Sequence, residues 1–410
     1  MKRMKCKSME DLPLEGKRVL VRIDINSPMG SENEILDDKR FRLHLPTLSE
    51  LERSKTVLMA HQSRPGRSDF TTLEAHAARL SELMGREILY VEDIFGGEAR
   101  RVISEMGDGD VVLLENVRFF AEEQLKRSAE EHAKSYPVRK LAPLLDIYIN
   151  DAFSVSHRPH LSVLGFTPVL PSLAGRLMER EIEALDKVLV DIKRPSVFVL
   201  GGVKAPDSFS VAENVLKRGV ADRVIFTGVL ANILLRASGV DIGRPNMSFI
   251  EEQGYLDQIE RAKNLLLSFR EKILLPHDLA LRGEGGERIE VPVEDLRNDM
   301  PIYDIGSGSI ERFSEIISSA GTVVMNGPAG RFEEKEFAKG TELLVKAATN
   351  AGFIVVGGGH IAAVVDELGV SDKISHISSG GGACLQYLAG NRLPGIEALV
   401  EAASRWDQVG

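Results

Sequence analysis

The sequence predicts an α/β protein built from two doubly wound, parallel-sheet (Rossmann-like) domains joined by a hinge helix. Short apolar runs rich in β-branched residues recur along the whole chain, and they are almost continuously apolar instead of alternating. Strands buried on both faces of a parallel sheet have this pattern. Each run is followed by a polar or glycine-rich turn and usually by a stretch with helical spacing, which is typical of repeated βαβ units.

The strands are expected in two groups of similar size. In the first half they lie at 18–23, 56–60, 88–92, 111–115 and 147–149. In the second half they lie at 196–200, 223–228, 272–275, 322–326 and 353–356, with a shorter run at 374–377. Around 276–299, a glycine-rich turn between two short apolar runs predicts a β-hairpin insertion with no obvious chemistry.

One segment interrupts this rhythm and is interpreted as a linker with a hinge helix. Between Phe166 and Ser196, Pro168 and Pro171 precede a helix-like stretch of about 20 residues, which Pro195 closes. The predicted organisation is an N-terminal domain 1–170, a linker 171–195, a C-terminal domain 196–390 and a tail 391–410. The sequence allows the tail to pack on either half, including back on the N-terminal domain.

Composition and charge narrow the class of protein. The 410 residues are 43% hydrophobic and 27% charged, which is typical of a globular chain of two or three domains. The net charge of −10 argues against binding nucleic acid or anionic membranes through bulk electrostatics. With only Cys6 and Cys384, neither a disulfide framework nor a cysteine zinc site is expected. The absence of a long apolar run or signal core predicts a cytoplasmic location.

Ligands of open parallel sheets bind beyond the carboxyl ends of the strands, and the turns expected there in the first half carry charged and polar side chains. These side chains are Asp24, Asn26, Arg40, His61, Arg64, Arg118, His157 and Arg158. Guanidinium groups that converge from several loops are suited to bidentate capture of a carboxylate or a phosphate. A surface salt bridge would explain any one arginine. Their recurrence at one topological position favours an anion site.

The corresponding turns of the second half carry glycine. They are LGGVKAPDS from residue 200, TGVL from 227, NGPAG from 326, GGGHIAA from 357 and SGGGACL from 379. Glycine lets the backbone approach a phosphate, whose charge the N–H groups of a following helix can bind. Tight strand-to-helix packing is the alternative for each turn alone. Neither a G-x-G-x-x-G nor a G-x-x-x-x-G-K-[ST] loop occurs at these turns, which argues against a standard Rossmann dehydrogenase or P-loop enzyme.

Two charged residues of the second half stand beside these turns. Lys204 follows GGV at a strand end, where an ammonium group would neutralise a phosphoryl group in transfer; the alternative is a solvent-facing lysine. Glu333 would accept hydrogen bonds from ribose hydroxyls; the alternative is an acidic residue that only stabilises a helix N-terminus. An arginine pocket in one domain and a backbone phosphate site in the other together predict phosphoryl transfer with domain closure.

In order and spacing, the turn motifs resemble the phosphoglycerate kinase family over essentially the whole chain. The matching segments are VRIDIN, AHQSRPGR, LLENVRF, NDAFSVSHR, LGGVKAPDS, VVMNGPAGRFE, VVGGGH and ISHISSGGGA. The wording AHQSRPGR and Ser208 resemble the archaeal branch. The resemblance implies a glycolytic or gluconeogenic kinase that transfers a phosphoryl group reversibly between 1,3-bisphosphoglycerate and ADP, giving 3-phosphoglycerate and ATP, with Mg²⁺ bound to the nucleotide.

The resemblance also implies roles for individual residues. The 3-phosphoglycerate site would comprise Asp24, Asn26, Arg40, His61, Gln62, Ser63, Arg64, Arg118 and Arg158. The nucleotide site would comprise Gly202, Lys204, Gly228, Asn326, Pro328, Glu333, Gly358, Gly359, His360 and Ile361. Gly380, Gly381 and Gly382 would receive the transferred phosphoryl group, and Arg40, Lys204, Gly358 and Gly381 would be catalytic. No residue is predicted to ligate the metal directly.

Three positions depart from the common family pattern. Ser208 removes a second phosphate-facing lysine, Met325 replaces a frequent tryptophan, and His360 stands where many members have an aspartate near the metal. Ser208 and His360 leave open how the α-phosphate and Mg²⁺ are held. Because Mg²⁺ prefers oxygen ligands, we expect it to arrive with the nucleotide, with Asp207 as the nearest candidate for an indirect contact.

Two other interpretations stay open at this point. The chain would also suit a related acyl-phosphate-forming kinase with another small carboxylate, because the arginine set does not specify a carbon skeleton. A nonenzymatic binding paralogue is disfavoured, because Lys204 and the triple glycines are retained. The partners expected are small molecules, with neither nucleic acid nor membrane, and the sequence leaves monomer and homodimer open.

Overall fold

The computed structural model describes residues 6–297 and 299–406, which divide into two compact units. The C-terminal unit is Ala184–Asn391, and the N-terminal unit is the described chain up to Glu183 together with the segment that starts at Arg392. Residues 1–5 of the predicted domain 1–170, Asn298 of the hairpin segment and residues 407–410 of the predicted tail lie outside the described residues. No helix in the described part of the chain has the length and apolar character to cross a membrane.

The N-terminal unit contains a six-stranded sheet in the order β3-β4-β2-β1-β5-β6, and every strand pair in it is parallel. Its strands are β1 (Arg18–Arg22), β2 (Lys55–Met59), β3 (Leu89–Val91), β4 (Val111–Leu114), β5 (Ile147–Asn150) and β6 (Ser172–Ala174). The first five confirm the strands expected in this half, to within one or two residues at each end.

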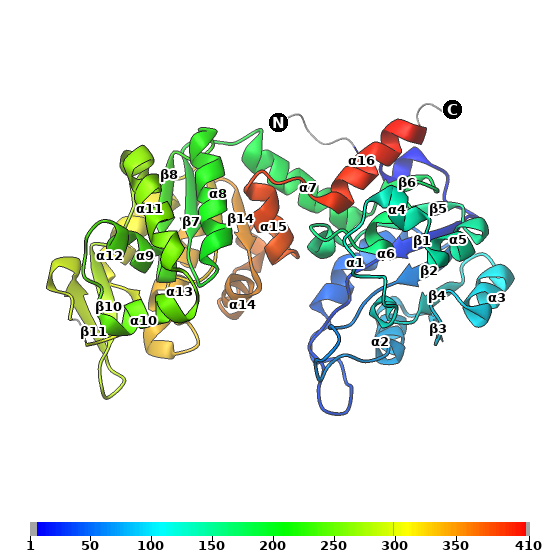
Figure 1. Cartoon of the computed structure of the whole chain (residues 1–410), viewed down its shortest axis with the longest axis horizontal. Coiled ribbons are helices and arrows are strands. Elements are labelled where there is room, and N and C mark those ends of the chain that lie inside the picture. The colour runs from blue at the N-terminus through cyan, green and yellow to red at the C-terminus, as the bar shows by residue number, and fades with distance from the viewer. Residues whose placement is uncertain (1–5, 298, 407–410) are drawn as a thin grey trace. The chain divides into compact units, whose positions relative to one another are not determined.

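Both faces of this sheet are covered, as its continuously apolar strands require. Along β1, Val19 and Val21 belong to one buried cluster with Phe41, whereas Leu20 belongs to the cluster on the other face with Tyr148. The helices are α1 (Lys39–Ser49), α2 (Glu74–Met84), α3 (Gly97–Glu105), α4 (Ala129–Ala133), α5 (Tyr136–Leu141), α6 (Leu161–Leu164) and α16 (Pro394–Trp406). Figure 1 shows them around the sheet.

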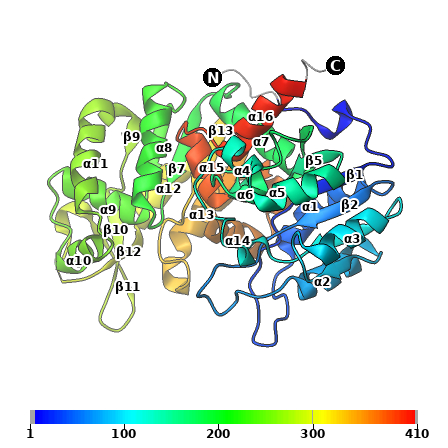
Figure 2. The same cartoon turned by 45° about the vertical axis from the view of Figure 1, so that its right-hand side comes forward.

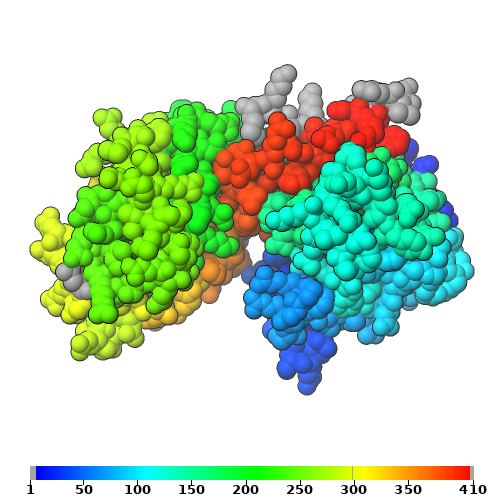
Figure 3. Space-filling model, in the orientation of Figure 1, coloured from blue at the N-terminus to red at the C-terminus, as the bar shows by residue number. Residues whose placement is uncertain are grey.

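The last helix, α16, packs on β6 and α6 of the N-terminal unit, although the chain reaches it only after completing the C-terminal unit. The Trp406 indole donates to the Leu170 carbonyl at 3.1 Å, and the Gly395 amide donates to the Ser156 carbonyl at 2.9 Å. In Figure 3, the red segment of α16 lies on the surface of this unit.

The C-terminal unit has a second parallel sheet of six strands, in the order β15-β14-β13-β7-β8-β9. Its strands are β7 (Ser196–Leu200), β8 (Arg223–Phe226), β9 (Ile273–Leu274), β13 (Thr322–Asn326), β14 (Ile354–Gly357) and β15 (His376–Ile377). Its helices are α8 (Ala205–Lys217), α9 (Gly228–Ala237), α10 (Arg244–Glu252), α11 (Leu256–Phe269), α12 (Ser307–Ser318), α13 (Lys339–Ala348), α14 (Gly359–Glu367) and α15 (Gly381–Leu388). Helix α11 packs beside α8 and α9 (Figure 2). The two doubly wound sheets confirm the predicted fold class.

The predicted hairpin forms and is part of a larger element. Strands β10 (Asp278–Arg282) and β11 (Arg288–Pro292) pair antiparallel, and β10 also pairs with β12 (Ile302–Ile305). Strand β12 was not expected, because its four residues include only two aliphatic ones and follow Pro301. The result is a separate three-stranded sheet, β11-β10-β12.

The segment 171–195 differs from the linker that the sequence predicted. It contains β6, which pairs in parallel with β5 from Ser172 to Ala174. The sequence did not predict this strand, because prolines precede it and its three residues are too few for a hydrophobic period to be recognised. Helix α7 (Arg176–Leu189) follows, shorter than the stretch expected, and its first turn donates two backbone N–H groups to Asp151. The boundary between the two compact units falls inside this helix.

Candidate active site

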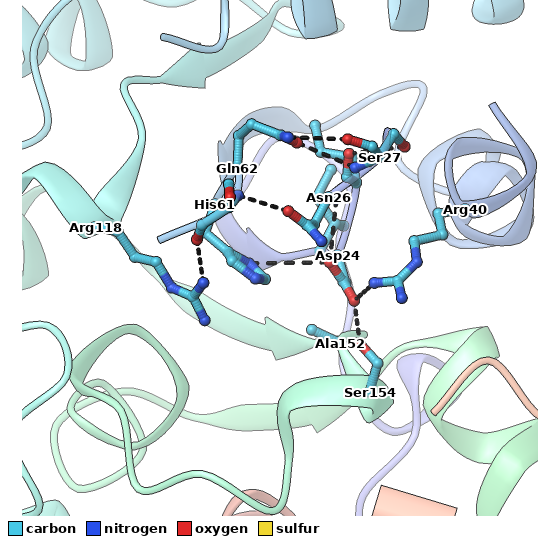
Figure 4. A network of polar contacts seen from close by, with 12 residues as sticks. Asp24, Asn26, Ser27, Arg40, His61, Gln62, Arg118, Ala152 and Ser154 are labelled. Atoms are coloured by element: carbon cyan, nitrogen blue, oxygen red, sulfur yellow. Dashed lines mark hydrogen bonds and ion pairs between the residues drawn. The ribbon is translucent and has the colours of Figure 1, made fainter. Parts of the chain in front are cut away.

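Asp24 lies at the centre of the polar residues that follow the strands of the N-terminal unit (Figure 4). The carboxylate is 4% exposed and accepts hydrogen bonds at Oδ2 from Arg40 and the Ser154 hydroxyl, and at Oδ1 from the Asn26 amide at 3.1 Å. Burial alone would raise the pKa of Asp24, but Arg40, His61 and the Ser154 hydroxyl together hold it well below its usual range. Asp24 is therefore a permanent anion that orients Arg40.

His61 is buried beside this carboxylate and is held as a neutral imidazole. Arg22 Nη2 donates to His61 Nδ1 at 3.1 Å, and a guanidinium can only donate, so Nδ1 accepts and the proton resides on Nε2. Burial lowers the pKa of His61 well below its usual value, and although the charge of Asp24 opposes this, the charges of Arg22 and Arg118 add to it. His61 therefore offers an N–H donor without a charge.

Arg118 and Arg158 are close enough to other cations for their pKa values to fall. Burial, followed by the charges of Arg158 and Arg22, lowers the pKa of Arg118 to about 10. Burial also lowers the pKa of Arg158, and Arg22, Arg40 and Arg64 add to the effect against the attraction of Asp24. These arginines thus form a positive cluster with too few carboxylates to neutralise it, an arrangement that a ligand with several negative charges stabilises.

The loop after β2 is shaped by hydrogen bonds within the unit. Gln62 is fully buried, and its side chain accepts from the Ser27 amide at 3.0 Å and donates to the Ser27 carbonyl at 2.9 Å. Asn26 accepts from the Ser63 amide at 2.6 Å, and Arg118 donates to the Ser63 carbonyl. Ser63 has a left-handed φ of 53°, an uncommon conformation for serine. The side chain of Gln62 thus holds the loop, while Arg64 stands exposed on it.

In the C-terminal unit, the predicted phosphate turns that begin at residues 200, 227 and 326 pack directly on one another; a Cβ on Gly228 would lie 2.9 Å from the Gly202 nitrogen. The Gly201 amide donates to the Asn326 carbonyl and the Gly202 amide to the Pro328 carbonyl, both at 2.8 Å. Gly327 has a φ of +79°, and a Cβ there would lie 2.1 Å from the Gly201 carbonyl oxygen. A Cβ on Gly201 would lie 2.4 Å from the Pro328 oxygen. At these turns, glycine serves the close packing that the sequence offered as the alternative.

The two triple-glycine turns differ from the others. Gly358 precedes α14 with a φ of +92°, and a Cβ on Gly359 would meet no atom within 4 Å. A Cβ on Gly381, the first residue of α15, would lie 3.5 Å from the Gly358 Cα, so the two turns are neighbours. Two helix N-termini therefore meet beside backbone that a ligand can approach, which suits a phosphate.

A cavity of about 740 Å³ within the C-terminal unit reaches the first of these turns at His360. Of the predicted nucleotide residues, Gly202, Gly228, Pro328, Glu333 and His360 line it. Lys204 stands exposed at the start of α8, and the triple glycines with Ile361 lie at the starts of α14 and α15. Ile361 is 1% exposed, which leaves only its backbone available to a ligand. Asn326 ends β13, and its buried Nδ2 has no hydrogen-bond partner among the described residues.

The sequence missed much of the wall of this cavity. Its additional residues include Asn232 on α9, Asn246 and Phe249 on α10, Leu279 on β10 and Pro301 to Ile305 around β12. The segment 276–299, interpreted as a hairpin with no obvious chemistry, contributes one apolar wall residue, Leu279, to this cavity. No local pattern marks these residues, because they meet only when α9, α10 and the three-stranded sheet pack together.

The departures from the family pattern have distinct environments. Ser208 is 1% exposed on α8, and its buried hydroxyl forms no hydrogen bond with the part of the chain that the structure describes. Met325 is buried inside β13. His360 is exposed at the start of α14, with its ring centroid 5.3 Å from that of Phe332. Within residues 6–297 and 299–406, no three His, Cys, Asp or Glu side chains cluster in a way that would hold a metal ion.

Comparisons with known proteins agree with the turn motifs. The model of the phosphoglycerate kinase family matches residues 9–391. The phosphoglycerate kinase of Methanosarcina mazei is 53% identical over 402 residues, which cover 98% of this chain and 96% of that protein. That of Methanothermobacter thermautotrophicus is 51% identical, with 97% of each chain covered. The crystal structure of phosphoglycerate kinase from Pyrococcus horikoshii OT3 superposes with a TM-score of 0.90 at 41% identity, over 97% of this chain and 99% of that one.

The family model, these relatives and the solved structure extend over both units, including the arginine-rich turns of the first and the glycine-rich turns of the second. The similarity is therefore not confined to the doubly wound fold, which unrelated enzymes share. The chain belongs to the phosphoglycerate kinase family.

Proposed function

We propose that the chain transfers a phosphoryl group reversibly between 1,3-bisphosphoglycerate and ADP, with 3-phosphoglycerate held by the N-terminal unit and the nucleotide by the C-terminal unit. Family membership makes it a phosphotransferase with a carboxyl acceptor. The observation that carries the division of substrates is the contrast between the arginine cluster around Asp24 and the glycine turns beside the cavity. A cytoplasmic location remains part of this proposal.

In the N-terminal unit, the proposed ligand has a phosphate and a carboxylate, and the cluster offers groups for both. Arg64, Arg118 and Arg158 supply charge-assisted donors from three different loops, and mutual repulsion among them favours binding of a polyanion. His61 Nε2–H adds a neutral donor. Arg40 is held by Asp24, which orients its guanidinium for the carboxylate that reacts. That carboxylate is ionised at neutral pH, so the reaction needs no general base.

In the C-terminal unit, we propose that the base and ribose occupy the cavity of about 740 Å³ and that the phosphates extend to the triple-glycine turns. Glu333 lines the cavity and would accept hydrogen bonds from the ribose hydroxyls. The N–H groups at the starts of α14 and α15 would bind the phosphoryl group, and Lys204 would neutralise the charge that moves with it. Direct transfer then rests on positioning and electrostatics.

Mg²⁺ fits this arrangement as a partner of the nucleotide phosphates. Asp207, exposed on the first turn of α8 next to Lys204, is the carboxylate we propose for an indirect contact through water. Bound there, the ion would neutralise phosphate charge. Calorimetric titration of nucleotide-free protein with Mg²⁺ is expected to show only weak binding, and a micromolar site would overturn this proposal.

A coupled assay of the full chain with 3-phosphoglycerate and Mg-ATP tests the proposed function. Turnover is expected, together with slower or no turnover for other small carboxylates. Lys204→Ala should lower kcat more than it raises either KM, because its charge is needed mainly in the transition state. A folded protein that does not turn over 3-phosphoglycerate but accepts a different carboxylate would instead identify a related acyl-phosphate-forming kinase.

A further inference from the structure

Helix α1 carries three polar residues on one face, Arg40, His44 and Thr47, at the spacing that brings side chains of successive helical turns together. His44 and Thr47 are 1% and 0% exposed, at positions where a helix that packs on a sheet usually carries apolar side chains. Arg40 reaches the Asp24 carboxylate (Figure 4). Buried polar groups need hydrogen-bond partners, so the partners of His44 and Thr47 indicate what this face does.

His44 connects the main chain of Asp24 to a buried carboxylate. Its Nδ1 lies 2.6 Å from Asp151 Oδ2, and because a carboxylate only accepts, Nδ1 carries the proton. At the other end of the ring, Nε2 accepts from the Asp24 amide at 3.0 Å. The Asp24 carbonyl oxygen is 3.1 Å from the same nitrogen, so a doubly protonated ring would still bond to this residue. The contact between His44 and the Asp24 main chain therefore does not depend on one protonation state.

Asp151 is fixed in turn by the start of α7. Its Oδ1 accepts from the amides of Leu177 and Met178 at 2.9 and 3.3 Å, which places negative charge at the N-terminus of that helix. Thr47 adds a parallel link, because its hydroxyl accepts from the Arg176 amide at 2.8 Å. All of these residues belong to the N-terminal unit. Three amides of the first turn of α7 thus anchor a network that ends in the proposed acid site.

The position of Asp24 in the chain explains why its main chain needs this support. Strand β1 ends at Arg22, so the Asp24 amide lies beyond the ladder of hydrogen bonds that β1 forms with β2 and β5. The Asp24 carboxylate in turn orients Arg40, the proposed partner of the reacting carboxylate. A displacement of the Asp24 main chain would therefore be passed on to this guanidinium group, and small errors of position are costly at a reacting centre.

We propose that His44 is a positioning residue for phosphoryl transfer, which holds the Asp24 main chain against the anchored start of α7 and thereby keeps Arg40 aimed at the substrate carboxylate. The inference rests on the proposed function, which places 3-phosphoglycerate beside Arg40. His44 itself is buried and acts on the substrate only through Asp24 and Arg40.

Two substitutions separate the two ends of the His44 ring. The side-chain amide of asparagine reaches about as far as Nδ1, so His44→Asn keeps a donor for Asp151 and loses the contact with Asp24. The amide of glutamine reaches about as far as Nε2, so His44→Gln keeps the contact with Asp24 and leaves one oxygen of Asp151 without its donor.

The two variants should rank in opposite orders for binding and for stability. Calorimetric titration of the full chain should show an affinity for 3-phosphoglycerate about two- to tenfold lower in His44→Asn, the effect of one neutral hydrogen bond, and near the wild-type value in His44→Gln. The melting temperature should fall further in His44→Gln, because the buried carboxylate of Asp151 loses a partner. A purely structural role of His44 would give the same order for both measurements and would overturn the proposal.

A double-mutant cycle tests whether the effect passes through Arg40. The effect of His44→Asn on the affinity for 3-phosphoglycerate is measured in the wild-type chain and in Arg40→Ala. It should disappear in Arg40→Ala, because the guanidinium group that the substitution misorients is already absent. Leu48→Ala is the control, since it truncates a buried apolar residue one turn further along α1. Any effect of Leu48→Ala should be the same factor in both backgrounds.

The outcomes separate this proposal from the one on which it rests. If the wild-type chain does not bind 3-phosphoglycerate, the proposed function fails and the role of His44 fails with it. If the wild type binds, but His44→Asn has no effect or the same effect with and without Arg40, the proposed function stands and the positioning role is overturned.

A measurement on the wild-type chain decides if His44→Asn does not fold. In nitrogen-15 NMR spectra, 3-phosphoglycerate should shift the Nε2 resonance of His44, because binding at Arg40 changes the bonds around Asp24. His277, in the C-terminal unit, is the internal control and should shift less. Equal or absent shifts would overturn the proposal.

Discussion

The two sheets share one architecture, but the turns at the carboxyl ends of their strands differ. In the N-terminal unit these turns present charged side chains, whereas in the C-terminal unit they present mainly the backbone of glycine-rich turns. Burial and neighbouring guanidinium groups lower the pKa values of Arg118 and Arg158, and the charge of Asp24 opposes both shifts. In the other unit, Gly201, Gly202 and Gly327 pack without side chains between them. A site of the first kind responds to charge and pH, whereas the packed turns of the second kind depend on backbone geometry and leave no room for a Cβ at Gly201 or Gly327.

The largest effect of a substitution is expected at Gly327, one of the closely packed glycines of the C-terminal unit. Gly327→Ala places a Cβ 2.1 Å from the Gly201 carbonyl oxygen on a residue with a φ of +79°. Backbone strain and overpacking together should cost about 4 kcal/mol of unfolding free energy, measured by denaturant titration. Gly97→Ala is the matched control, since a Cβ there meets no atom within 4 Å, and it should change stability little. Equal effects of the two substitutions would contradict the packing role.

The buried histidines of the N-terminal unit should make stability fall with acid. Burial lowers the pKa of His76 to about 4, and burial with the charges of Arg118 and Arg22 lowers that of His160 to about 3. The unfolded chain, in which histidine titrates near 6.5, therefore binds more protons than the folded one below that pH. Stability is full above about pH 6.5 and should decline towards pH 4, with roughly 3 kcal/mol attributable to His76.

Denaturant titrations at a series of pH values measure this decline. His76→Leu should flatten the profile between pH 6.5 and 4, because it removes the group that protonates. Leu80→Ala, a core truncation on the same helix, should lower stability by a similar amount at every pH and leave the slope unchanged. An unchanged slope in His76→Leu would show that His76 is not the source.

Arg40→Ala and Arg158→Ala sharpen the proposed division of substrates. A charge-assisted hydrogen bond contributes roughly 1.5 to 3 kcal/mol to binding, so each substitution should lower the affinity for 3-phosphoglycerate about ten- to a hundredfold. Nucleotide affinity should stay nearly unchanged, since both residues lie in the N-terminal unit. Arg101→Ala, on the exposed face of α3, is the control and should affect neither ligand. Calorimetric titration with each substrate alone measures these affinities. Equal losses of affinity for both substrates would refute the proposal that each unit binds a different substrate.

The smallest effect is expected at Ser208. Its hydroxyl is buried and bonds to none of the described residues, so Ser208→Ala should leave stability unchanged or raise it by less than about 1 kcal/mol. Nucleotide affinity should also be unchanged, because the side chain is only 1% exposed. Thermal unfolding and ADP titration measure both quantities. A several-fold loss of ADP affinity would mean that the hydroxyl reaches the α-phosphate after all.

The sequence predicted the fold well because parallel strands buried on both faces have a distinctive pattern, as in 111–115 and 322–326. It failed where elements are short or follow proline, as in β6 and β12. The turn residues around Asp24 were predicted because chemistry recurs at strand ends, but the hydrogen bonds that occupy Gln62 were not. Asn232 and Asn246 escaped notice because tertiary packing, not local sequence, brings them to one cavity.

The return of the chain to the N-terminal unit has a consequence for biosynthesis. Among the described residues, the C-terminal unit is one continuous segment, so its whole sequence is translated before α16 of the N-terminal unit. The Gly395 amide, near the start of that helix, bonds to the carbonyl of Ser156, two residues from Arg158. The loop that carries a proposed substrate arginine is therefore fastened by a helix that is translated after the C-terminal unit. A chain without α16 would lack the hydrogen bond that fastens the loop of Arg158, and its acid site would be unfinished.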